Sequence, residues 1–400
     1  MKIYQMLHFP LEGAGTGIYV DNLTRSLAKK GHQLAVLCSD HHRPKRDYPV
    51  ETVLFSNGRN ETFDLDFDFP VFASHPLSKG QKFGELSDAQ LKAYFDIFRA
   101  KIESGTFQFA PDIIHVHHGW IIASILAEFD IPYVISLHGT EYYAFKNFAN
   151  CRDFALRGLH NARIVLTLTQ EERQQAVDTY GLETQKTDVV KSGVDTEKFK
   201  PLQIDRDELL SSHSVRELGR PVVFLGGRLT AQKGVDTLLR AAQIYSHTDE
   251  KPVTLIAGDG DLKQPLEELA ARLKLDSVYF LGNQSHEQMI KLSNIADVVA
   301  LPSVFEPFGL VAVEALACGT PVIASRIGGL TQIVNDQLGC FIEPGDYKAL
   351  ADKITALIKG RLKEKQRDKI VAYTRQNFSW DNTVSNIENI YERVLSARCP

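Results

Sequence analysis

The chain has 400 residues, of which 44% are hydrophobic and 24% are charged, as in an ordinary globular protein. This length exceeds a single core and predicts two domains of ~150–200 residues each. The formal net charge of −5 provides no broad basic field, which argues against nucleic acid as the main partner.

The cysteines and the N-terminus bear on where the protein works. Five cysteines are scattered along the chain, and no two form a CxxC pair. Neither a disulfide framework nor a zinc site is therefore predicted, and the cytoplasm is the expected location. The polar N-terminal stretch does not resemble a signal peptide, and no apolar run reaches the ~18–20 residues that span a bilayer. Peripheral contact with a membrane surface stays open.

Short apolar runs alternate with amphipathic helical patterns, which predicts α/β layers around parallel sheets. In the first half, strands are expected at residues 2–9, 34–38, 112–116, 133–137 and 164–168. A helix is expected after the glycine turn at 13–17, because Val20, Leu23 and Leu27 recur at helical spacing. Residues 41–82 are interpreted as loops and short strands.

A second α/β set begins near residue 221. Its strands are expected at residues 222–226, 253–257, 278–281, 297–301, 321–324 and 340–342. Ser285 and Gln288 have capping-box spacing at the start of one intervening helix, and a last helix is expected at 384–395. Two Rossmann-like halves result, and ligands of such sheets bind outside the carboxyl ends of the strands.

The first glycine turn follows a strand and precedes a helix. Gly13, Gly15 and Gly17 would bring backbone N–H groups toward a phosphate or a sugar. The plainer alternative is a tight turn without a ligand, since the spacing is GxGxG and not the dinucleotide GxGxxG. Asp40, after the second strand, keeps an NAD interpretation open.

A second loop, at residues 226–234, carries two cations between a strand and a helix. Arg228 offers a bidentate fork and Lys233 a compact charge, and together they suit a diphosphate. The alternative is two solvated surface side chains, which most lysines and arginines are. The adjacent glycines and the strand-to-helix position favour the functional interpretation.

Two carboxylates follow the strand at 297–301. Glu306 lies in a Pro/Gly turn, and Glu314 lies within the apolar helix predicted at 309–318. A buried carboxylate needs a partner, and the hydroxyls of a sugar or ribose are good ones. The first N–H groups of this helix have no partner within the helix and can bind an oxyanion. A solvated loop acid and a helix acid paired with a cation are the alternatives.

Histidines cluster after two strands of the first half, at His115, His117, His118 and His138. A metal site is disfavoured, because His115 and His117 alternate along a strand and no cysteine is near. His138 suits a hydrogen bond to a ligand. The DxD pattern at 64–68 is interpreted as a loop or edge strand with a wet acidic face.

The chain resembles the retaining GT-B glycosyltransferases, in particular the family 4 group. The resemblance rests on the turn at 13–17, the His138-Gly139 pair, the loop at 227–234, and Glu306-(x)7-Glu314 with the following run to Ser325. It implies an α/β fold of two Rossmann-like domains that face each other across a cleft. The expected parts are an acceptor-binding domain at 1–195, a nucleotide-sugar-binding domain at 196–380, and a C-terminal helix at 381–400 that crosses back to the first domain.

The resemblance also implies roles for individual residues. The expected catalytic residues are Arg228, Lys233, Glu306 and His138. The expected donor contacts are Gly15, Gly17, Arg228, Lys233, Gln284, Glu306, Phe308, Gly309, Leu310 and Glu314. The expected acceptor contacts are His117, His118, Trp120 and Glu141, although Trp120 and nearby aromatics are also candidates for the core. No metal and no cofactor are expected.

The implied reaction is transfer of a hexosyl unit from a nucleotide diphosphate sugar, most often a UDP-sugar, with retention of configuration. The acceptor is a hydroxyl of a sugar, a cyclitol, a lipid or another small molecule. A nucleotide-sugar epimerase and a sugar phosphorylase are alternatives on the same scaffold. An NAD(P)-dependent oxidoreductase is disfavoured, because GxGxxG is missing and the second half carries a cationic loop.

Overall fold

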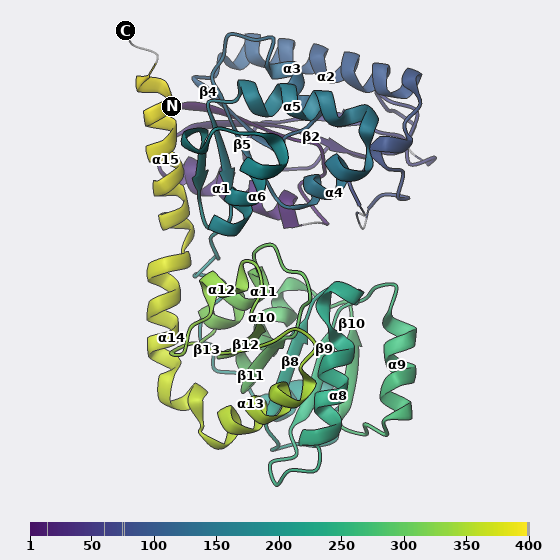
Figure 1. The fold of residues 1–400 in the computed structure, drawn as a ribbon, viewed down its shortest axis with the longest axis vertical. Coiled ribbons are helices and arrows are strands. Elements are labelled where there is room, and N and C mark those ends of the chain that lie inside the picture. Colours follow the sequence, from purple (N-terminus) through teal and green to yellow (C-terminus); the bar gives the residue numbers. More distant parts are fainter. Residues whose placement is uncertain (14, 60, 74, 76, 398–400) are drawn as a thin grey trace. The chain divides into compact units, whose positions relative to one another are not determined.

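The computed structural model describes residues 1–13, 15–59, 61–73, 75 and 77–397 (Figure 1). Backbone contacts divide the chain into an N-terminal unit, Met1–Lys191 with the described part of Thr383–Pro400, and a C-terminal unit, Ser192–Asn382. Each unit has its own parallel sheet and its own core. Four cysteines in the described residues are free thiols, and the fifth, Cys399, lies outside those residues.

The N-terminal unit is built on a seven-stranded parallel sheet in the order β3-β2-β1-β4-β5-β6-β7. Its strands are β1 (Lys2–Leu7), β2 (Gln33–Asp40), β3 (Val50–Leu54), β4 (Ile113–His117), β5 (Tyr133–Ser136), β6 (Ile164–Thr167) and β7 (Thr187–Val189). The five predicted strands are confirmed, with ends that shift by one or two residues. The short edge strand β7 was not predicted, because the surrounding Thr, Asp and Lys residues give it no apolar run.

Helices and short 3₁₀ turns connect these strands. They are α1 (Gly15–Lys29), η1 (Phe83–Glu85), α2 (Asp88–Phe109), α3 (Ile121–Leu126), α4 (Thr140–Asn147), η2 (Ala149–Cys151), α5 (Arg152–Asn161), η3 (Thr184–Lys186) and α6 (Gln170–Tyr180). Ser87 begins α2 through a capping box with Gln90. Gly181 ends α6 at φ 65°, where a glycine adopts the left-handed region without strain.

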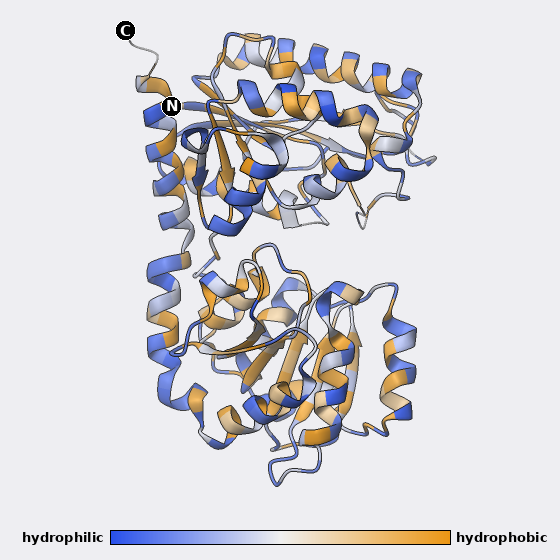
Figure 2. Cartoon of the chain, viewed as in Figure 1, coloured by the Kyte–Doolittle hydropathy of each residue, from blue (hydrophilic) through white to orange (hydrophobic). Residues whose placement is uncertain are grey.

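The C-terminal unit has a six-stranded parallel sheet in the order β10-β9-β8-β11-β12-β13. Its strands are β8 (Val222–Gly226), β9 (Val253–Ala257), β10 (Val278–Gly282), β11 (Val298–Leu301), β12 (Val322–Ser325) and β13 (Gly339–Ile342). All six were predicted. Figure 2 shows apolar residues concentrated in these strands and on the helix faces that cover them, as expected for a parallel sheet buried on both sides.

The helices of this unit alternate with its strands. They are α7 (Arg206–Ser212), η4 (Ala231–Lys233), α8 (Val235–Tyr245), α9 (Lys263–Arg272), α10 (His286–Ile295), α11 (Leu310–Ala317), α12 (Leu330–Ile333), α13 (Tyr347–Lys359) and α14 (Leu362–Phe378). Ser285 caps α10 by accepting a hydrogen bond from the Gln288 N–H at 3.2 Å. The predicted N-cap is therefore confirmed, but the second bond of a capping box is absent, because the side-chain oxygen of Gln288 has no partner among the described residues.

The last helix, α15 (Trp380–Ser396), belongs to the N-terminal unit from Thr383 onward. The buried Tyr391 hydroxyl lies 2.6 Å from His115 Nδ1. On its exposed side, Glu388 bonds His32 at 2.7 Å and Arg393 bonds Asp188 at 2.6 Å. The predicted return of the terminal helix to the first domain is confirmed.

The acidic segment at 64–68 differs from its sequence interpretation in one residue. Asp64 and Asp66 are exposed, but Asp68 is buried. Its carboxylate lies 2.7 Å from His41 Nε2 and accepts hydrogen bonds from the Ser78 hydroxyl and the Lys79 N–H. Asp68 thus ties together two loops, and the expectation of a wet acidic face is wrong for this residue.

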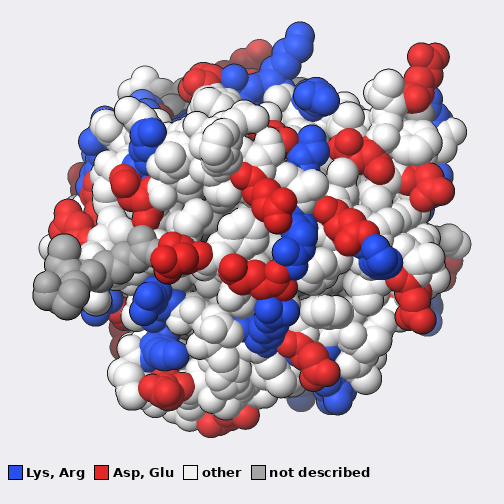
Figure 3. Space-filling model, turned by 90° about the horizontal axis from the view of Figure 1, so that it is seen from above, with Lys and Arg blue, Asp and Glu red and all other residues white. Residues whose placement is uncertain are grey.

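The surface carries both signs of charge. On the face drawn in Figure 3, lysines and arginines alternate with aspartates and glutamates, without a large area of one sign. Within the described ranges, no helix has both the length and the apolar content needed to cross a membrane.

Candidate functional site

The order of the strands in the C-terminal sheet reverses between β8 and β11, although all its strands are parallel. Successive strands run outward from β8 through β9 to β10, and outward on the other side from β11 through β12 to β13. In open α/β sheets, ligands bind outside the carboxyl ends of the strands at such a switch point. The loop after β8 carries Arg228 and Lys233, and the loop after β11 carries Glu306, so the expected donor residues flank this point.

Glycines allow the loops around the switch point to touch through their backbones. A Cβ added at Gly258 would lie 1.9 Å from the Gly227 carbonyl oxygen, and one at Gly234 would lie 2.0 Å from the Pro302 carbonyl oxygen. A Cβ at Gly328 would meet the Glu306 carbonyl oxygen at 2.3 Å. No larger residue fits at these positions without moving a loop, so the glycines fix where the charged side chains stand.

We expect Gly258→Ala to cost more stability than a glycine replacement in open space. Both Gly258 and Gly219 have positive φ, but only Gly258 faces a neighbouring backbone, and nothing lies within 4 Å of Gly219. Gly219→Ala should lose about 1 kcal/mol of unfolding free energy from its backbone strain, and Gly258→Ala clearly more, about 2–4 kcal/mol. Urea unfolding of both variants measures this. Equal losses would show that the contact with Gly227 does not restrain the loop.

Lys233 and Glu306 meet directly, although 73 positions separate them in the chain. Lys233 Nζ donates to Glu306 Oε2 at 2.6 Å, and the side chains are 26% and 13% exposed. The two loops are also joined by a hydrogen bond from the Val304 N–H to the Gln232 carbonyl, 2.8 Å long. The pair holds an ammonium and a carboxylate side by side within reach of solvent.

Helix α11 begins next to this pair. Gly309 precedes it at φ 104°, and the Phe308 side chain is buried beneath the turn. Within the described chain, the N–H groups of Phe308, Gly309 and Leu310 donate no hydrogen bond to another backbone group. The start of α11 therefore presents free donors, together with the positive end of the helix dipole, to an anion.

Glu314 lies on α11 and is only partly exposed. Burial raises the pKa of its carboxyl group to about 8. None of the described residues makes a hydrogen bond or an ion pair with this carboxyl group. Glu314 is therefore an acid that lacks a partner, as expected of a group that receives one from a ligand.

Two further expected donor contacts are Arg228 and Gln284. Arg228 is exposed on the loop after β8. The Gln284 side chain donates to the Leu281 carbonyl at 2.6 Å, which steadies the turn after β10. Gln284 thus supports the turn with its side chain and leaves the backbone of that turn to meet a ligand.

The N-terminal sheet has its own switch point, between β1 and β4. Gly15 and Gly17 open α1 after β1, and a Cβ at Gly17 would lie 2.2 Å from the Pro10 carbonyl oxygen. Gly17 is thus required by packing, whereas Gly15 has nothing within 4 Å. Of the two glycines, only Gly15 has room beside its Cα among the described residues.

A cluster of histidines follows β4 and β5. His117 lies 2.7 Å from the Gln5 side-chain oxygen and 3.1 Å from His138 Nε2. His118 lies 3.2 Å from the Glu141 carboxylate, which also accepts the His138 N–H at 2.9 Å. Burial lowers the pKa values of His117 and His138 well below the ordinary range. These two imidazoles are neutral, so they act as hydrogen-bond partners and not as cations.

Trp120 has different surroundings from the other expected acceptor residues. Trp120 is fully buried and packs edge-on against Phe72 and Phe83. His117, His118 and Glu141 are also buried, but they form one polar network. The core alternative left open by the sequence describes Trp120 and its aromatic neighbours.

Sequence reasoning missed the glycines that bring the loops of the C-terminal unit together. Gly258, Gly260, Gly328 and Gly329 each approach the backbone of a loop that carries an expected donor residue. Their signal is present in the sequence as two short glycine clusters after strands. It is weak without the structure, because the same clusters also suit ordinary turns.

Two protein families match this chain, one in each half. Residues 207–377 match the family described as Glycosyl transferases group 1, and residues 13–198 match Glycosyltransferase Family 4. A relative from Acidothermus cellulolyticus, named D-inositol 3-phosphate glycosyltransferase, is 31% identical over 419 residues, which cover 97% of this chain and 87% of the relative.

Two solved structures share the fold. The Anabaena protein HepE, in complex with UDP, has a TM-score of 0.74 at 20% identity and covers 98% of this chain and 100% of its own. The catalytic domain of starch synthase IV from Arabidopsis thaliana, bound to ADP and acarbose, has a TM-score of 0.73 at 17% identity and covers 99% of both chains. At these identities the two structures support only the fold, whereas the relative from Acidothermus cellulolyticus supports the family.

Proposed function

We propose, because this chain belongs to the family 4 glycosyltransferases, that it moves a hexosyl unit from a nucleotide diphosphate sugar to a hydroxyl acceptor. Its family, its GT-B fold and its glycosyltransferase activity were predicted from the sequence and are confirmed by the comparisons. The finer parts of the reaction are our proposal. A UDP-sugar is the first candidate donor, since HepE was solved with UDP, and an ADP-sugar is the second, since starch synthase IV was solved with ADP.

One observation carries the proposal: the Lys233–Glu306 pair stands beside the free N–H groups of α11 at a topological switch point. An ammonium and a helix start suit a diphosphate, and a carboxylate suits sugar hydroxyls. Glu314, on helix α11, offers a second acid for the ribose diol. Arg228 adds a cation on the loop that carries Lys233.

The proposed step retains the configuration of the sugar. The bond between the anomeric carbon and the phosphate oxygen breaks, and the acceptor oxygen bonds to the same face of that carbon. The acceptor proton passes to the departing phosphate oxygen. Lys233, Arg228 and the start of α11 offset the charge that develops on the diphosphate, and Glu306 orients the sugar through its hydroxyls.

The donor is tested by thermal shift with UDP, ADP, GDP and their glucose conjugates. A ligand at 100 times its Kd adds about 2.7 kcal/mol of stability, so the true nucleotide should raise the melting temperature by several degrees. The absence of a shift with any of them would remove the donor site. NMR of the product then gives the anomeric configuration, and an inverted centre contradicts the proposed step.

The same assays separate the alternative reactions. A phosphorylase requires inorganic phosphate or releases it, and an epimerase converts the nucleotide sugar without an acceptor. Activity measured with and without EDTA tests the proposed independence from metal ions. Single substitutions test Gly15, Gly17 and His138 as donor contacts, and His117, His118, Trp120 and Glu141 as acceptor contacts. The cytoplasmic location stays a prediction from the cysteine pattern.

A further inference from the structure

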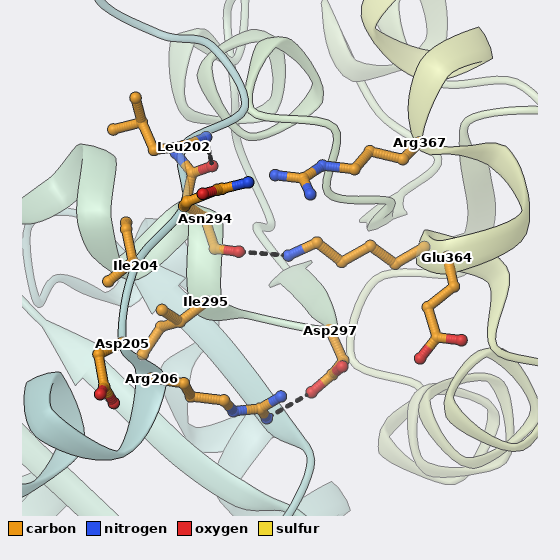
Figure 4. A pocket seen from close by; sticks show the side chains of 11 residues that line it. Leu202, Ile204, Asp205, Arg206, Asn294, Ile295, Asp297, Glu364 and Arg367 are labelled. Atoms are coloured by element: carbon orange, nitrogen blue, oxygen red, sulfur yellow. Dashed lines mark hydrogen bonds and ion pairs between the residues drawn. The ribbon is translucent and has the colours of Figure 1, made fainter.

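A polar cavity lies in the C-terminal unit, away from the proposed donor site. It has a volume of about 580 Å³. Its walls come from residues 202–206, from the end of α10, from Asp297 before β11 and from the first turns of α14 (Figure 4). Asp297 precedes β11 and Glu306 follows it. The cavity therefore lies at the amino end of this strand, and the donor site lies at its carboxyl end.

Three cations line this cavity, and they have unused hydrogen-bond donors. Within the described residues, Arg367 makes no ion pair or hydrogen bond, and its Nε is buried. Arg206 bonds Asp297 and the Arg220 carbonyl through one nitrogen, and its buried Nε has no partner in the described part of the chain. Lys363 donates to two carbonyls of the α10 end, those of Asn294 and Ala296, each at 2.5 Å.

The acids of the cavity are already engaged by the protein. Asp297 accepts hydrogen bonds from Arg206 and from the Val222 N–H, at 2.7 and 2.6 Å. Asp205 caps α7 by accepting the Glu208 N–H. Glu364 pairs with Arg361 at 2.6 Å, and in Figure 4 it points away from Arg367. The lining therefore carries three carboxylates, each with a partner in the protein, beside three cations that have donors to spare.

The position of Arg367 is fixed by the end of α11. Gly319 has φ +79°, and a Cβ there would lie 2.6 Å from Arg367 Cγ. The side-chain stem of Arg367 thus passes over a glycine, and its guanidinium reaches toward Asn294 (Figure 4). This packing presents the planar fork of an arginine, the group that binds phosphate in a bidentate way.

We propose that this cavity binds a small phosphorylated molecule, with its phosphate on Arg367 and Lys363. The volume lies within the ~300–1,000 Å³ of small-molecule sites, so a phosphate alone does not fill it. Leu202, Ile204 and Ile295 offer apolar contacts to the remainder of the molecule. A sugar phosphate has both parts, a dianion for the cations and a ring face for the apolar wall.

The electrostatics of Lys363 support the same assignment. Burial lowers the pKa of Lys363 to about 8, the Asp297 carboxylate opposes this, and Arg367 and Arg206 add to it. The nearby buried Cys318 thiol has a pKa of about 12 and stays protonated. A phosphate between the cations would relieve their mutual repulsion and raise the pKa of Lys363. Binding near pH 8 is therefore accompanied by proton uptake.

Isothermal titration calorimetry of the full chain with glucose 6-phosphate tests the site, with inorganic phosphate and glucose in separate arms. We expect glucose 6-phosphate to bind wild type and Lys233→Ala equally, and Arg367→Gln at least about tenfold more weakly. Lys369→Gln, an exposed change on the same helix, should bind as wild type does. Inorganic phosphate should bind more weakly than glucose 6-phosphate, and glucose should not bind.

Three results would overturn the proposal. They are no binding of either phosphate at millimolar concentration, binding that Arg367→Gln leaves intact, and binding that Lys233→Ala abolishes, which would place the phosphate at the donor site. If Arg367→Gln fails to fold by circular dichroism, Arg367→Lys keeps the charge and removes the fork, and it should still weaken binding. For wild type at pH 8, titrations in Tris and in HEPES must give different heats, and equal heats contradict the contact with Lys363.

Discussion

Replacing Lys233 with alanine is expected to lower kcat by about 10²–10³-fold, or about 2–4 kcal/mol of barrier. The ammonium of Lys233 is held beside Glu306 at 2.6 Å before any ligand arrives. A charge that is already oriented needs little reorganisation when the diphosphate departs, which is why its loss should affect kcat and not only KM. Initial rates with the donor identified by thermal shift measure the effect.

The pairing of Lys233 with Glu306 sharpens this experiment. In the single variant, Glu306 loses its cation and places a bare carboxylate near the diphosphate. The double variant Lys233→Ala/Glu306→Ala should therefore lose less than the sum of the two single losses. Lys348→Ala, an exposed change on α13, is the control and should retain wild-type rates. A kcat within threefold of wild type for Lys233→Ala would exclude the lysine as a diphosphate contact.

Replacing Glu314 with glutamine is expected to stabilise the protein at alkaline pH and to weaken nucleotide binding. The folded protein keeps the Glu314 proton up to about pH 8, whereas the unfolded chain releases it near 4.5. The folded state thus binds more protons across this window, so the contribution of Glu314 to stability falls as the pH rises from 4.5 to 8. Glutamine carries no charge and avoids that loss.

The gain should be small at pH 5 and reach roughly 2–4 kcal/mol at pH 9, at about 1.4 kcal/mol per unit of pKa shift and with an allowance for partial exposure. Urea unfolding of wild type and variant at both pH values measures it. Glu172 in the N-terminal unit also has its pKa raised by burial to about 8, but it is present in both proteins, so their difference isolates Glu314. Glu267→Gln, an exposed change on α9, serves as the control.

The same variant tests the proposed ribose contact. At pH 8 and above, where the Glu314 carboxyl group ionises, loss of this acceptor for two hydroxyls should weaken UDP binding by about tenfold or more. Wild-type affinity should rise as the pH approaches 8, since the ionised carboxyl is the better acceptor, and the affinity of the variant should not follow pH in this way. A variant that gains stability but binds UDP as well as wild type would leave Glu314 a buried acid without a ligand.

The positions of most strands along the chain, and the loops at their carboxyl ends, could be predicted from the sequence. Parallel strands that are buried on both faces read as short apolar runs, and residues 222–226 and 253–257 were predicted with their observed ends. Arg228, Lys233 and Glu306 were recognised because they directly follow such runs. Helix α11 was found for the same reason, and Glu314 stood out as a single acid among apolar neighbours.

Contacts between distant positions could not be predicted in this way. Nothing in the sequence pairs Lys233 with Glu306, because side-chain partners across two loops depend on backbone approaches that only the glycines at 234, 258 and 328 permit. Asp68 looked like its exposed neighbours, yet it is buried because His41 and Ser78 come from other loops. Arg367 looked like any lysine or arginine of a charged helix. That it has no partner among the described residues is visible only once the end of α10 and Asp297 are brought beside it.

The terminal helix has a consequence for synthesis on the ribosome. His115 lies in the middle of the first sheet to be translated, but its partner Tyr391 is among the last residues of the described chain. Residues 1–191 can supply Ser136 to one ring nitrogen of His115, but the partner of the other nitrogen is translated only after the entire second unit. Although translation begins with the N-terminal unit, that unit is the last to be finished, and a fragment that ends at residue 191 should expose the apolar surface that α15 covers.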